Sequence, residues 1–488
     1  MKKIISIMLC AAMTMCMLGG CGEKEKTESG KVSENSIVSK PTTITFSFWE
    51  AGVEQEQEKA LTKIIEKYKE VQPDITVELL SQPNSGYQEW LKSMFLSKSA
   101  PNIISNHSGL TAINYKDGYI ENISKNFNEP SPYGDGKTLW KDDFQDGKIA
   151  SAHNYKYDAQ FAVPYFGMGL AYYYNKDIYE KLGLKVPKTW NEFMSNCAAC
   201  EKAGYKPISL MLMKEAALSW MEQYVGTGLF AKKYLLDTRI NVNKDGYISP
   251  EEWAKAIDDG YLDITKGEDR ELLEQYIDIL HQYAKYCPGA SGLDEAGAKS
   301  EFLAGKSAHI MSGSWDLQAF LNYKGQNIGA FPFPKFTTEN GKYAGDNYGV
   351  DMVQVLSVSK TKDDDKRKAA IDFVQFLTSK DINQIFMKDT YSIPTIKGIS
   401  VSKDFAAFTK YSAPMLQLYS FSSDTNEWSL NEVSNQALMG KKIDLDKISG
   451  ELVKSLNERS ATIKKNSDIG PQNNYGFDNM VTMGKMPE

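Results

Sequence analysis

Apolar residues follow the two periods of regular secondary structure from about residue 42 onward. Ile44, Phe46 and Phe48 alternate with polar residues, which is the period of a half-buried strand. The next segment carries apolar residues at helical spacing until Pro73 ends it. The elements predicted first are a strand at 44–48, a helix over 54–71, a strand over 75–80, a helix over 87–97 and a strand at 102–105. This order predicts an α/β fold with a largely parallel sheet.

The same patterns continue to the end of the chain. The further predicted strands lie at 162–164, 170–174, 308–311, 328–331 and 352–358, and the helices lie within 189–303 and over 366–377 and 431–439. In the strand at 170–174, three consecutive tyrosines face alternate sides, so at least one of them is expected in the core. No internal repeat is evident.

The N-terminal twenty residues have the pattern of an export signal. Lys2 and Lys3 precede an apolar run over 4–18, which fits a signal-peptide core and is too short for a comfortable membrane span. The run ends in Leu-Gly-Gly-Cys at 18–21, which resembles the lipobox of bacterial lipoproteins. The resemblance implies cleavage after residue 20 and acylation of Cys21. Residues 21–40, rich in Glu, Lys, Ser and Gly, are expected to form a flexible tether to the membrane.

Charge and composition narrow the class of partner. The chain of 488 residues has a formal net charge of −7 and no basic block, which argues against nucleic acid as a partner. Only four of its basic residues are arginines, so bidentate forks for anionic ligands are scarce. Its 27 tyrosines, 21 phenylalanines and 8 tryptophans suit either large cores or a ligand with apolar faces and polar edges.

Three cysteines remain for the fold after the signal peptide and the lipidated Cys21 are set aside. An odd number of thiols cannot all pair within the chain, so no disulfide framework is expected. Cys197 and Cys200 form a Cys-x-x-Cys within the predicted helix 189–203, and Cys287 stands alone. The pair could be redox-active or metal-binding, or could simply be two small, semi-buried helix residues.

Six stretches, in order, resemble the signature stretches of extracellular solute-binding proteins of ABC importers, in the maltose- and oligosaccharide-binding branch. They are ITFSFW at 44–49, PDITV at 73–77, PNII at 101–104, LAYYYNKD at 170–177, PKTWNEF at 187–193, and FLAGKSA at 302–308 followed by Gly-Ser-Trp at 313–315. The resemblance covers nearly the whole chain after the tether. It implies a non-enzymatic, monomeric, extracytoplasmic receptor that delivers a carbohydrate, expected to be a neutral oligosaccharide, to the permease subunits of an importer.

The resemblance also implies two hinged α/β lobes with the ligand in a cleft between them. Matching the crossing segments places hinges near 164–169, 349–354 and 391–397. The first lobe is then expected over 41–165 and 354–395, and the second over 166–353 and 396–488. Glycines beside strand ends suit such hinges because they absorb changes in φ and ψ at low cost.

A sugar ring needs flat aromatic surfaces and neutral or acidic hydrogen-bonding groups. Open α/β sheets place ligands at the carboxyl ends of their strands, and Trp49 and Glu50 close the first strand. Family resemblance adds Trp315 and Trp428 as stacking platforms, each with core packing as the alternative. The candidate ligand residues are Trp49, Glu50, Asn106, Trp315, Asp346 and Trp428, with His107 and Asn347 of lower rank.

Residues 241–252 fit the twelve-residue EF-hand calcium loop, with glycine at the sixth position and isoleucine at the eighth. The ligand positions are Asn241, Asn243, Asp245, Tyr247 through its backbone, Ser249 and Glu252. Asn241 stands where the pattern almost always has aspartate, which should weaken the affinity. Such loops occur in related oligosaccharide-binding proteins, so Ca²⁺ is expected to be structural. A turn rich in Asn, Asp and Gly is the alternative.

Two other functions compete with the receptor. An exported glycoside hydrolase would need only two paired carboxylates, which spacing alone does not exclude. No Gly-x-Ser-x-Gly, His-Glu-x-x-His or Walker loop is present, however, and the four histidines are scattered. A calcium-dependent adhesion module would account for the EF-hand-like loop, but not for the importer-like stretches.

Overall fold

The first lobe is built on a six-stranded sheet with the order β13-β6-β12-β3-β1-β2. The computed structural model describes residues 32–33, 35–50, 56–83, 86–107, 114–145, 148–149, 153–154, 159–212, 215–244, 248–345, 348–349, 352–409, 413–414 and 430–479. The lobe contains β1 (Thr42–Glu50), α1 (Glu56–Val71), β2 (Ile75–Pro83), α2 (Tyr87–Leu96), β3 (Ile103–His107), α4 (Ser124–Phe127), η1 (Trp140–Asp143), β4 (His153–Asn154), β5 (Ala159–Gln160), β6 (Val163–Met168), β12 (Met352–Val358), α12 (Asp364–Leu377), α13 (Lys380–Thr390) and β13 (Ile393–Pro394).

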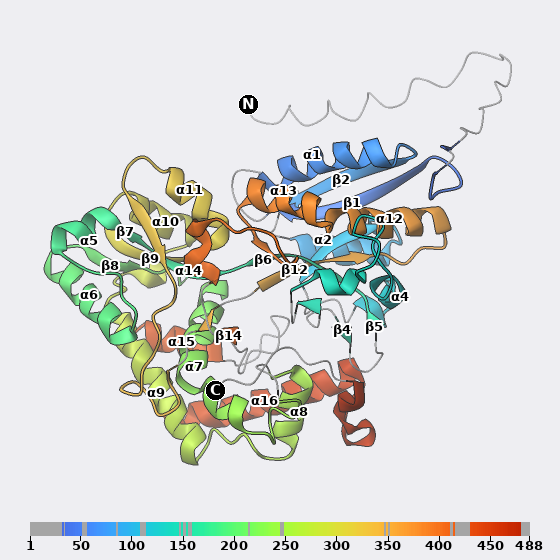
Figure 1. The fold of residues 1–488 in the computed structure, drawn as a ribbon. Coiled ribbons are helices and arrows are strands. Elements are labelled where there is room, and N and C mark those ends of the chain that lie inside the picture. Colours follow the sequence, from blue (N-terminus) through green and yellow to red (C-terminus); the bar gives the residue numbers. More distant parts are fainter. Residues whose placement is uncertain are drawn as a thin grey trace, which may run out of the picture.

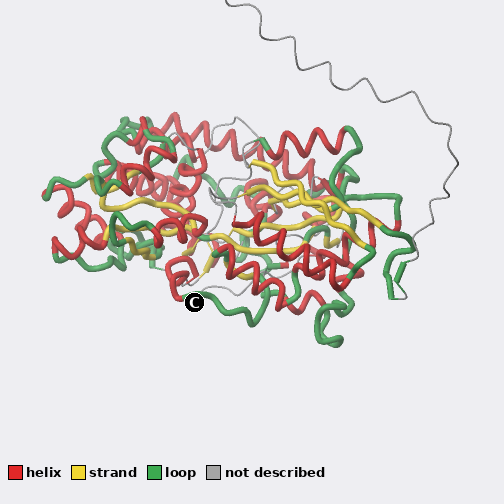
Figure 2. The backbone as a smooth tube through the Cα atoms, turned by 90° about the horizontal axis from the view of Figure 1, so that it is seen from above, coloured by secondary structure: helices red, strands yellow, loops and turns green. Residues whose placement is uncertain are grey.

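The second lobe is built on a four-stranded sheet with the order β10-β7-β9-β8. It contains β7 (Leu170–Asn175), α5 (Lys176–Leu182), α6 (Trp190–Lys202), β8 (Lys206–Ser209), α7 (Glu215–Leu236), α8 (Pro250–Asp258), α9 (Gly267–Ala284), η3 (Ala290–Gly292), α10 (Glu295–Leu303), β9 (Ser307–Gly313), η4 (Ser314–Asp316), α11 (Leu317–Asn322), β10 (Ile328–Phe331), η5 (Lys403–Phe405), α14 (Ala406–Thr409), α15 (Leu430–Leu438), α16 (Leu445–Ser467) and η6 (Pro471–Asn479). A short parallel pair joins β11 (Tyr348–Gly349) to β14 (Ala413–Pro414). Figure 1 shows the two sheets in separate lobes, and Figure 2 shows their strands as two groups flanked by helices.

The prediction of a largely parallel sheet is wrong. Only β2, β1 and β3 run parallel in the first sheet, and they form the predicted strand-helix-strand order. β12 pairs antiparallel with both β3 and β6. These strands connect to the other lobe, so their direction is set by where the chain crosses and not by a local βαβ unit.

The chain changes lobes at Gly169. β6 pairs in the first sheet up to Met168, and β7 begins in the second sheet at Leu170, a few residues beyond the predicted boundary at 165. A Cβ atom on Gly169 would come within 3.0 Å of Cβ of Phe408 in α14. The glycine therefore allows α14 to approach the crossing strand closely. This close approach is a structural reason for a glycine at position 169, separate from the hinge role predicted from the sequence.

Part of the predicted tether is packed on the first lobe. Val38 is buried in its core, and Ser39 donates to Asp365 from both its backbone N–H, at 3.0 Å, and its Oγ, at 2.6 Å. Ser33 donates in the same two ways to Asp74, at 2.8 and 2.6 Å. The prediction of a flexible segment up to residue 40 is therefore wrong for these residues.

Among the described residues, no helix is long and apolar enough to cross a membrane.

Candidate functional site

The ring of Trp315 lies where the two lobes meet. β9 ends at Gly313, and η4 carries Trp315 directly after it. A Cβ atom on Gly313 would lie 2.2 Å from the Trp315 ring, so the ring sits over a backbone that has no side chain. Trp315 packs against the cores of both lobes and is partly exposed. A partly exposed indole between two lobes has the geometry that a stacking surface requires.

Two hydrogen bonds tie this position to the crossing strand. The backbone N–H of Ser314 donates to the carbonyl oxygen of Gly169, at 2.8 Å. The N–H of Gly169 donates in return to the hydroxyl of Ser314, at 3.3 Å. Trp315 is therefore held next to the residue at which the chain changes lobes.

Trp220 is a second aromatic residue at this position, and the sequence did not single it out. It comes from α7, its ring centroid lies 5.7 Å from that of Trp315, and the two rings are inclined by 52°. Only 7% of its surface is exposed. It lies in the second turn of α7, the helix that follows β8, whereas Trp49 was singled out because it closes β1. Trp220 is nearly as buried as Trp49, so Trp315 is the indole that stays partly exposed here, and Trp220 packs against it.

The candidates of the first lobe lie at adjacent strand ends but are packed inside. Trp49 is 4% exposed, and its ring meets that of Tyr87 edge-on at 4.8 Å. Asn106 is fully buried near the end of β3, where it pairs with Val355. Each would need a neighbouring element to move before it could contact a ligand. Glu50 and His107 are the last residues of β1 and β3.

Several predicted site residues lie outside the part of the chain that the structure describes. These are Cys21, Asp245, Tyr247, Asp346, Asn347 and Trp428.

In the described part of the EF-hand-like loop, Glu252 accepts hydrogen bonds from the backbone. One carboxylate oxygen accepts the N–H groups of Val242, at 2.7 Å, and Asn243, at 3.2 Å, and the other accepts that of Ser249, at 2.8 Å. Ser249 Oγ accepts from the N–H of Glu252, which completes a capping box at the start of α8. The amide nitrogen of Asn241 donates to the carbonyl of Leu235, at 2.8 Å. A cation in this loop would share Glu252 with three N–H groups.

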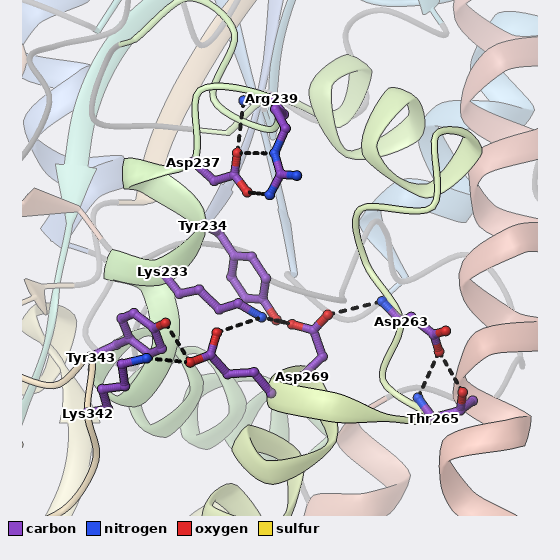
Figure 3. Close-up of polar contacts among 10 residues, drawn as sticks. Lys233, Tyr234, Asp237, Arg239, Asp263, Thr265, Asp269, Lys342 and Tyr343 are labelled. Carbon is purple, nitrogen blue, oxygen red and sulfur yellow. Dashed lines mark hydrogen bonds and ion pairs between the residues drawn. The ribbon is translucent and has the colours of Figure 1, made fainter.

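A polar cluster fixes the helices that carry this loop (Figure 3). Asp269, at the start of α9, accepts from Lys233 Nζ, from Tyr234 Oη at 2.8 Å and from the N–H of Asp263 at 3.1 Å. Hydrogen bonds from Thr265 and Lys266 lower the pKa of Asp263 to about 2. The cluster joins the end of α7 to the start of α9, the two helices that precede and follow the loop and α8 in the sequence.

The same helices hold a second group of paired charges. Glu268 accepts from Lys342 Nζ and from Tyr343 Oη, both at 2.7 Å. Asp237 receives a fork from Arg239, with Nε at 2.9 Å and Nη2 at 2.5 Å. These acidic groups are already paired with cations of the chain, so they stabilise the scaffold and leave ligand binding to other residues.

The three described cysteines are buried, and each is a free thiol. Burial raises the pKa of the Cys200 thiol to about 11 and that of Cys197 above its usual range. Thiols that stay protonated in a core are poor nucleophiles and poor metal ligands. Among the described residues, no group of three or more His, Cys, Asp or Glu could hold a metal ion. The Cys-x-x-Cys is therefore part of the packing of α6.

Two other titratable groups are buried in the second lobe. His309 on β9 lies between Tyr179 and the carbonyl of Pro207, and burial lowers its pKa to about 4. Glu222 on α7 is 1% exposed, and burial raises its pKa to about 8. Both side chains lie inside the lobe and affect its stability.

The model of the bacterial extracellular solute-binding protein family matches residues 63–413. The chain belongs to this family. The predicted receptor is therefore confirmed over the predicted alternative of a glycoside hydrolase, and the family description places the protein outside the cytoplasm.

Curated relatives of this solute-binding protein align with it over most of its length. The chain is 25% identical to the multiple sugar-binding protein of Streptococcus mutans serotype c, over 82% of this chain and 84% of that protein. It is 22% identical to the galactooligosaccharide-binding protein of Bacillus subtilis, over 82% of each chain.

Solved structures confirm the predicted two-lobed α/β fold. The solute-binding protein RafE in complex with raffinose superposes with a TM-score of 0.60 at 21% identity, covering 86% of this chain and 100% of that one. A chitin oligosaccharide binding protein reaches a TM-score of 0.65 at 18% identity, covering 86% and 99%.

Proposed function

We propose that the protein is an extracytoplasmic receptor that binds a neutral oligosaccharide between its lobes and delivers it to the permease of an ABC importer. The observation that carries the proposal is Trp315, which is partly exposed between the cores of the two lobes and packs against Trp220. Relatives named for sugars and galactooligosaccharides support a carbohydrate, and a relative named as an ABC transporter periplasmic-binding protein supports the importer.

Stacking explains why a partly exposed tryptophan suits such a ligand. The C–H face of a sugar ring is apolar and packs on an aromatic face, while the hydroxyl rim needs hydrogen bonds. Four arginines in the whole chain leave few forks for a charged ligand, which favours a neutral one. Trp428 and Asp346 remain predicted contacts of the same ligand.

A thermal-shift screen identifies the ligand. Raffinose, galactooligosaccharides, chitin oligosaccharides and maltose form the neutral panel, with sugar phosphates as the charged control. A ligand at a hundred times its Kd stabilises the folded protein by about 2.7 kcal/mol, which raises Tm. A shift with sugar phosphates alone would contradict the proposal of a neutral ligand.

Substitution of the two indoles then tests the site. With the best ligand of the screen, Trp220→Ala and Trp315→Ala should each raise Kd at least tenfold, which corresponds to about 1.4 kcal/mol of lost contact. Tyr323→Ala is the control, since Tyr323 is 39% exposed near the end of α11. Unchanged affinity in both tryptophan variants would rule out the pair as the binding surface.

The lipobox supports a lipid anchor at Cys21. Two or more acyl chains give stable attachment, whereas a single chain binds only marginally. Cys21→Ala should release the protein from the membrane fraction. A variant that stays with the membrane after a salt wash would contradict the anchor.

The EF-hand-like loop supports a weak structural Ca²⁺ site. Asn241 contributes no charge and Glu252 is shared with backbone N–H groups, so Kd is expected near ~10⁻⁴ to 10⁻³ M, the range of extracellular modules. The test compares Tm in calcium with Tm in chelator. The wild type should shift and Glu252→Gln should not. An equal shift of Tm in both proteins would mean that calcium binds elsewhere. No shift of Tm in the wild type would contradict a calcium site in this loop.

A further inference from the structure

Helix α16 starts in the core of the second lobe and ends beside the first. Its first half packs in that core through Ile448, Leu452 and Leu456. Farther along, Lys464 forms an ion pair with Asp258 of α8, with Nζ and Oδ2 2.6 Å apart. Figure 1 shows α16 passing beneath the first lobe, below the crossing strands β6 and β12. The helix is thus a rigid arm of the second lobe.

The end of this arm accepts a hydrogen bond from the other lobe. A helix leaves its last four carbonyl oxygens without intrahelical donors. Asp468 ends α16 in the left-handed conformation, at φ 49°, and its N–H donates to the carbonyl of Lys464. The next carbonyl oxygen, that of Lys465, accepts from Nζ of Lys116 in the first lobe, at 3.1 Å. This end carries the negative pole of the helix dipole, which favours an ammonium group.

The backbone that carries Lys116 is well fixed in the first lobe. The ring of Tyr115 stacks on Phe161 at 5.1 Å, and that of Tyr119 stacks on Phe95 at 4.5 Å. The N–H of Tyr119 donates to the carbonyl of Asn114, at 2.9 Å, which closes the turn. The ammonium of Lys116 is therefore presented from a rigid site, while its side chain remains exposed.

We propose that Lys116 and the C-terminal end of α16 form an interlobe clamp that favours the lobe arrangement described here. The crossing strands connect the lobes covalently and Trp315 packs between them, and the clamp adds a reversible polar connection at the far end of α16. An ammonium at a helix end should change the ratio of clamped to unclamped molecules about two- to fivefold. The clamp acts in the unliganded protein, whereas any effect on sugar affinity rests on the proposed function.

Double electron–electron resonance on the unliganded protein tests the clamp. Spin labels are attached at Glu70→Cys on α1 and Glu271→Cys on α9, both exposed, in the Cys21→Ala protein whose described thiols are buried. Lys116→Met removes the donor, and Lys116→Glu places a negative charge at the negative end of the helix. Lys125→Met is the control, since Lys125 is an exposed lysine of the same lobe.

The ratio of molecules at the wild-type interlobe distance to molecules at other distances should fall about two- to fivefold in Lys116→Met and further in Lys116→Glu. The control variant should keep the wild-type distribution. Identical distributions in the wild type and Lys116→Glu would overturn the clamp. No sugar is added, so this result is independent of whether the receptor function is correct.

Discussion

Replacing His309 tests the description of the second-lobe core through its pH dependence. The carbonyl of Pro207 can only accept, so Nδ1 of His309 carries the proton and donates to it, at 2.8 Å. Nε2 then accepts from the hydroxyl of Tyr179, at 2.7 Å. The ring is neutral, fully buried and satisfied on both nitrogens. Protonation would place a charge in the core and take away the acceptor of Tyr179.

The sign and size of the effect follow from the two pKa values. Burial lowers the pKa of His309 from 6.5 in the unfolded chain to about 4 in the folded one. The neutral histidine therefore contributes its full stability above pH 6.5, and this contribution is lost as the pH falls from 6.5 toward 4. The loss amounts to about 2 kcal/mol by pH 5 and about 3 kcal/mol over the whole range.

Urea unfolding of the wild type and His309→Gln between pH 7.5 and 4.5 measures this contribution. Glutamine keeps a donor and an acceptor but does not titrate, so its free energy of unfolding lacks the histidine term. Glu222 works in the opposite direction, because its raised pKa gives stability that is lost as the pH rises from 4.5 to about 8. That term is common to both proteins and cancels in their difference.

The advantage of the wild type over His309→Gln should shrink by about 2 kcal/mol between pH 7.5 and 5. A difference that stays constant within about 0.5 kcal/mol over this range would refute a buried, neutral His309.

Three further substitutions give separate tests. Gly313→Ala should displace the ring of Trp315 and raise the Kd for the ligand of the thermal-shift screen about tenfold. Gly292→Ala is the control, because a Cβ atom there meets nothing within 4 Å, and it should leave Kd unchanged. Equal affinities of the two variants in calorimetry would contradict the packing of the Trp315 ring over Gly313. Gly450→Ala, inside α16 with open space around it, should raise the free energy of unfolding by about 0.5–1 kcal/mol in urea titrations, and a decrease would argue against a helix there. Ser39→Ala removes the hydrogen bond from Oγ to Asp365 and keeps the one from the backbone N–H, so it should raise the rate of limited proteolysis of the N-terminal segment. A cleavage rate equal to that of the wild type would show that the Oγ hydrogen bond does not hold the segment.

The elements were largely predictable because their patterns are local. The helix predicted over 54–71 is α1, and the strand predicted over 352–358 is β12, since each buries one face along a regular period. The direction of β12 was not predictable, because it depends on the chain returning from the other lobe. The periodic pattern of apolar residues shows which face of a helix or strand is buried. The order and direction of strands in a sheet depend on contacts between residues that lie far apart in the sequence.

The site was predictable only in part, for the same reason. Trp315 was found through family resemblance, but Trp220 meets it from a helix almost a hundred residues earlier. Trp49 was chosen for its place at a strand end, and it is α2 that covers its ring through Tyr87. Val38 stands in a stretch without an apolar period, so its burial was not predicted; it accompanies the hydrogen bonds between Asp365 and the neighbouring Ser39.

The docked N-terminal segment would limit the distance between the protein and a membrane to which Cys21 is anchored. If Cys21 carries the lipid as proposed, the chain between it and the docked Ser33 spans at most about 45 Å when fully extended. The attachment point lies at the edge of the first lobe marked by Asp74. The protein would then diffuse within a thin layer along the membrane surface, with this edge of the first lobe facing the lipid. It would meet a permease by lateral diffusion, and the second lobe would lie in the outer part of that layer.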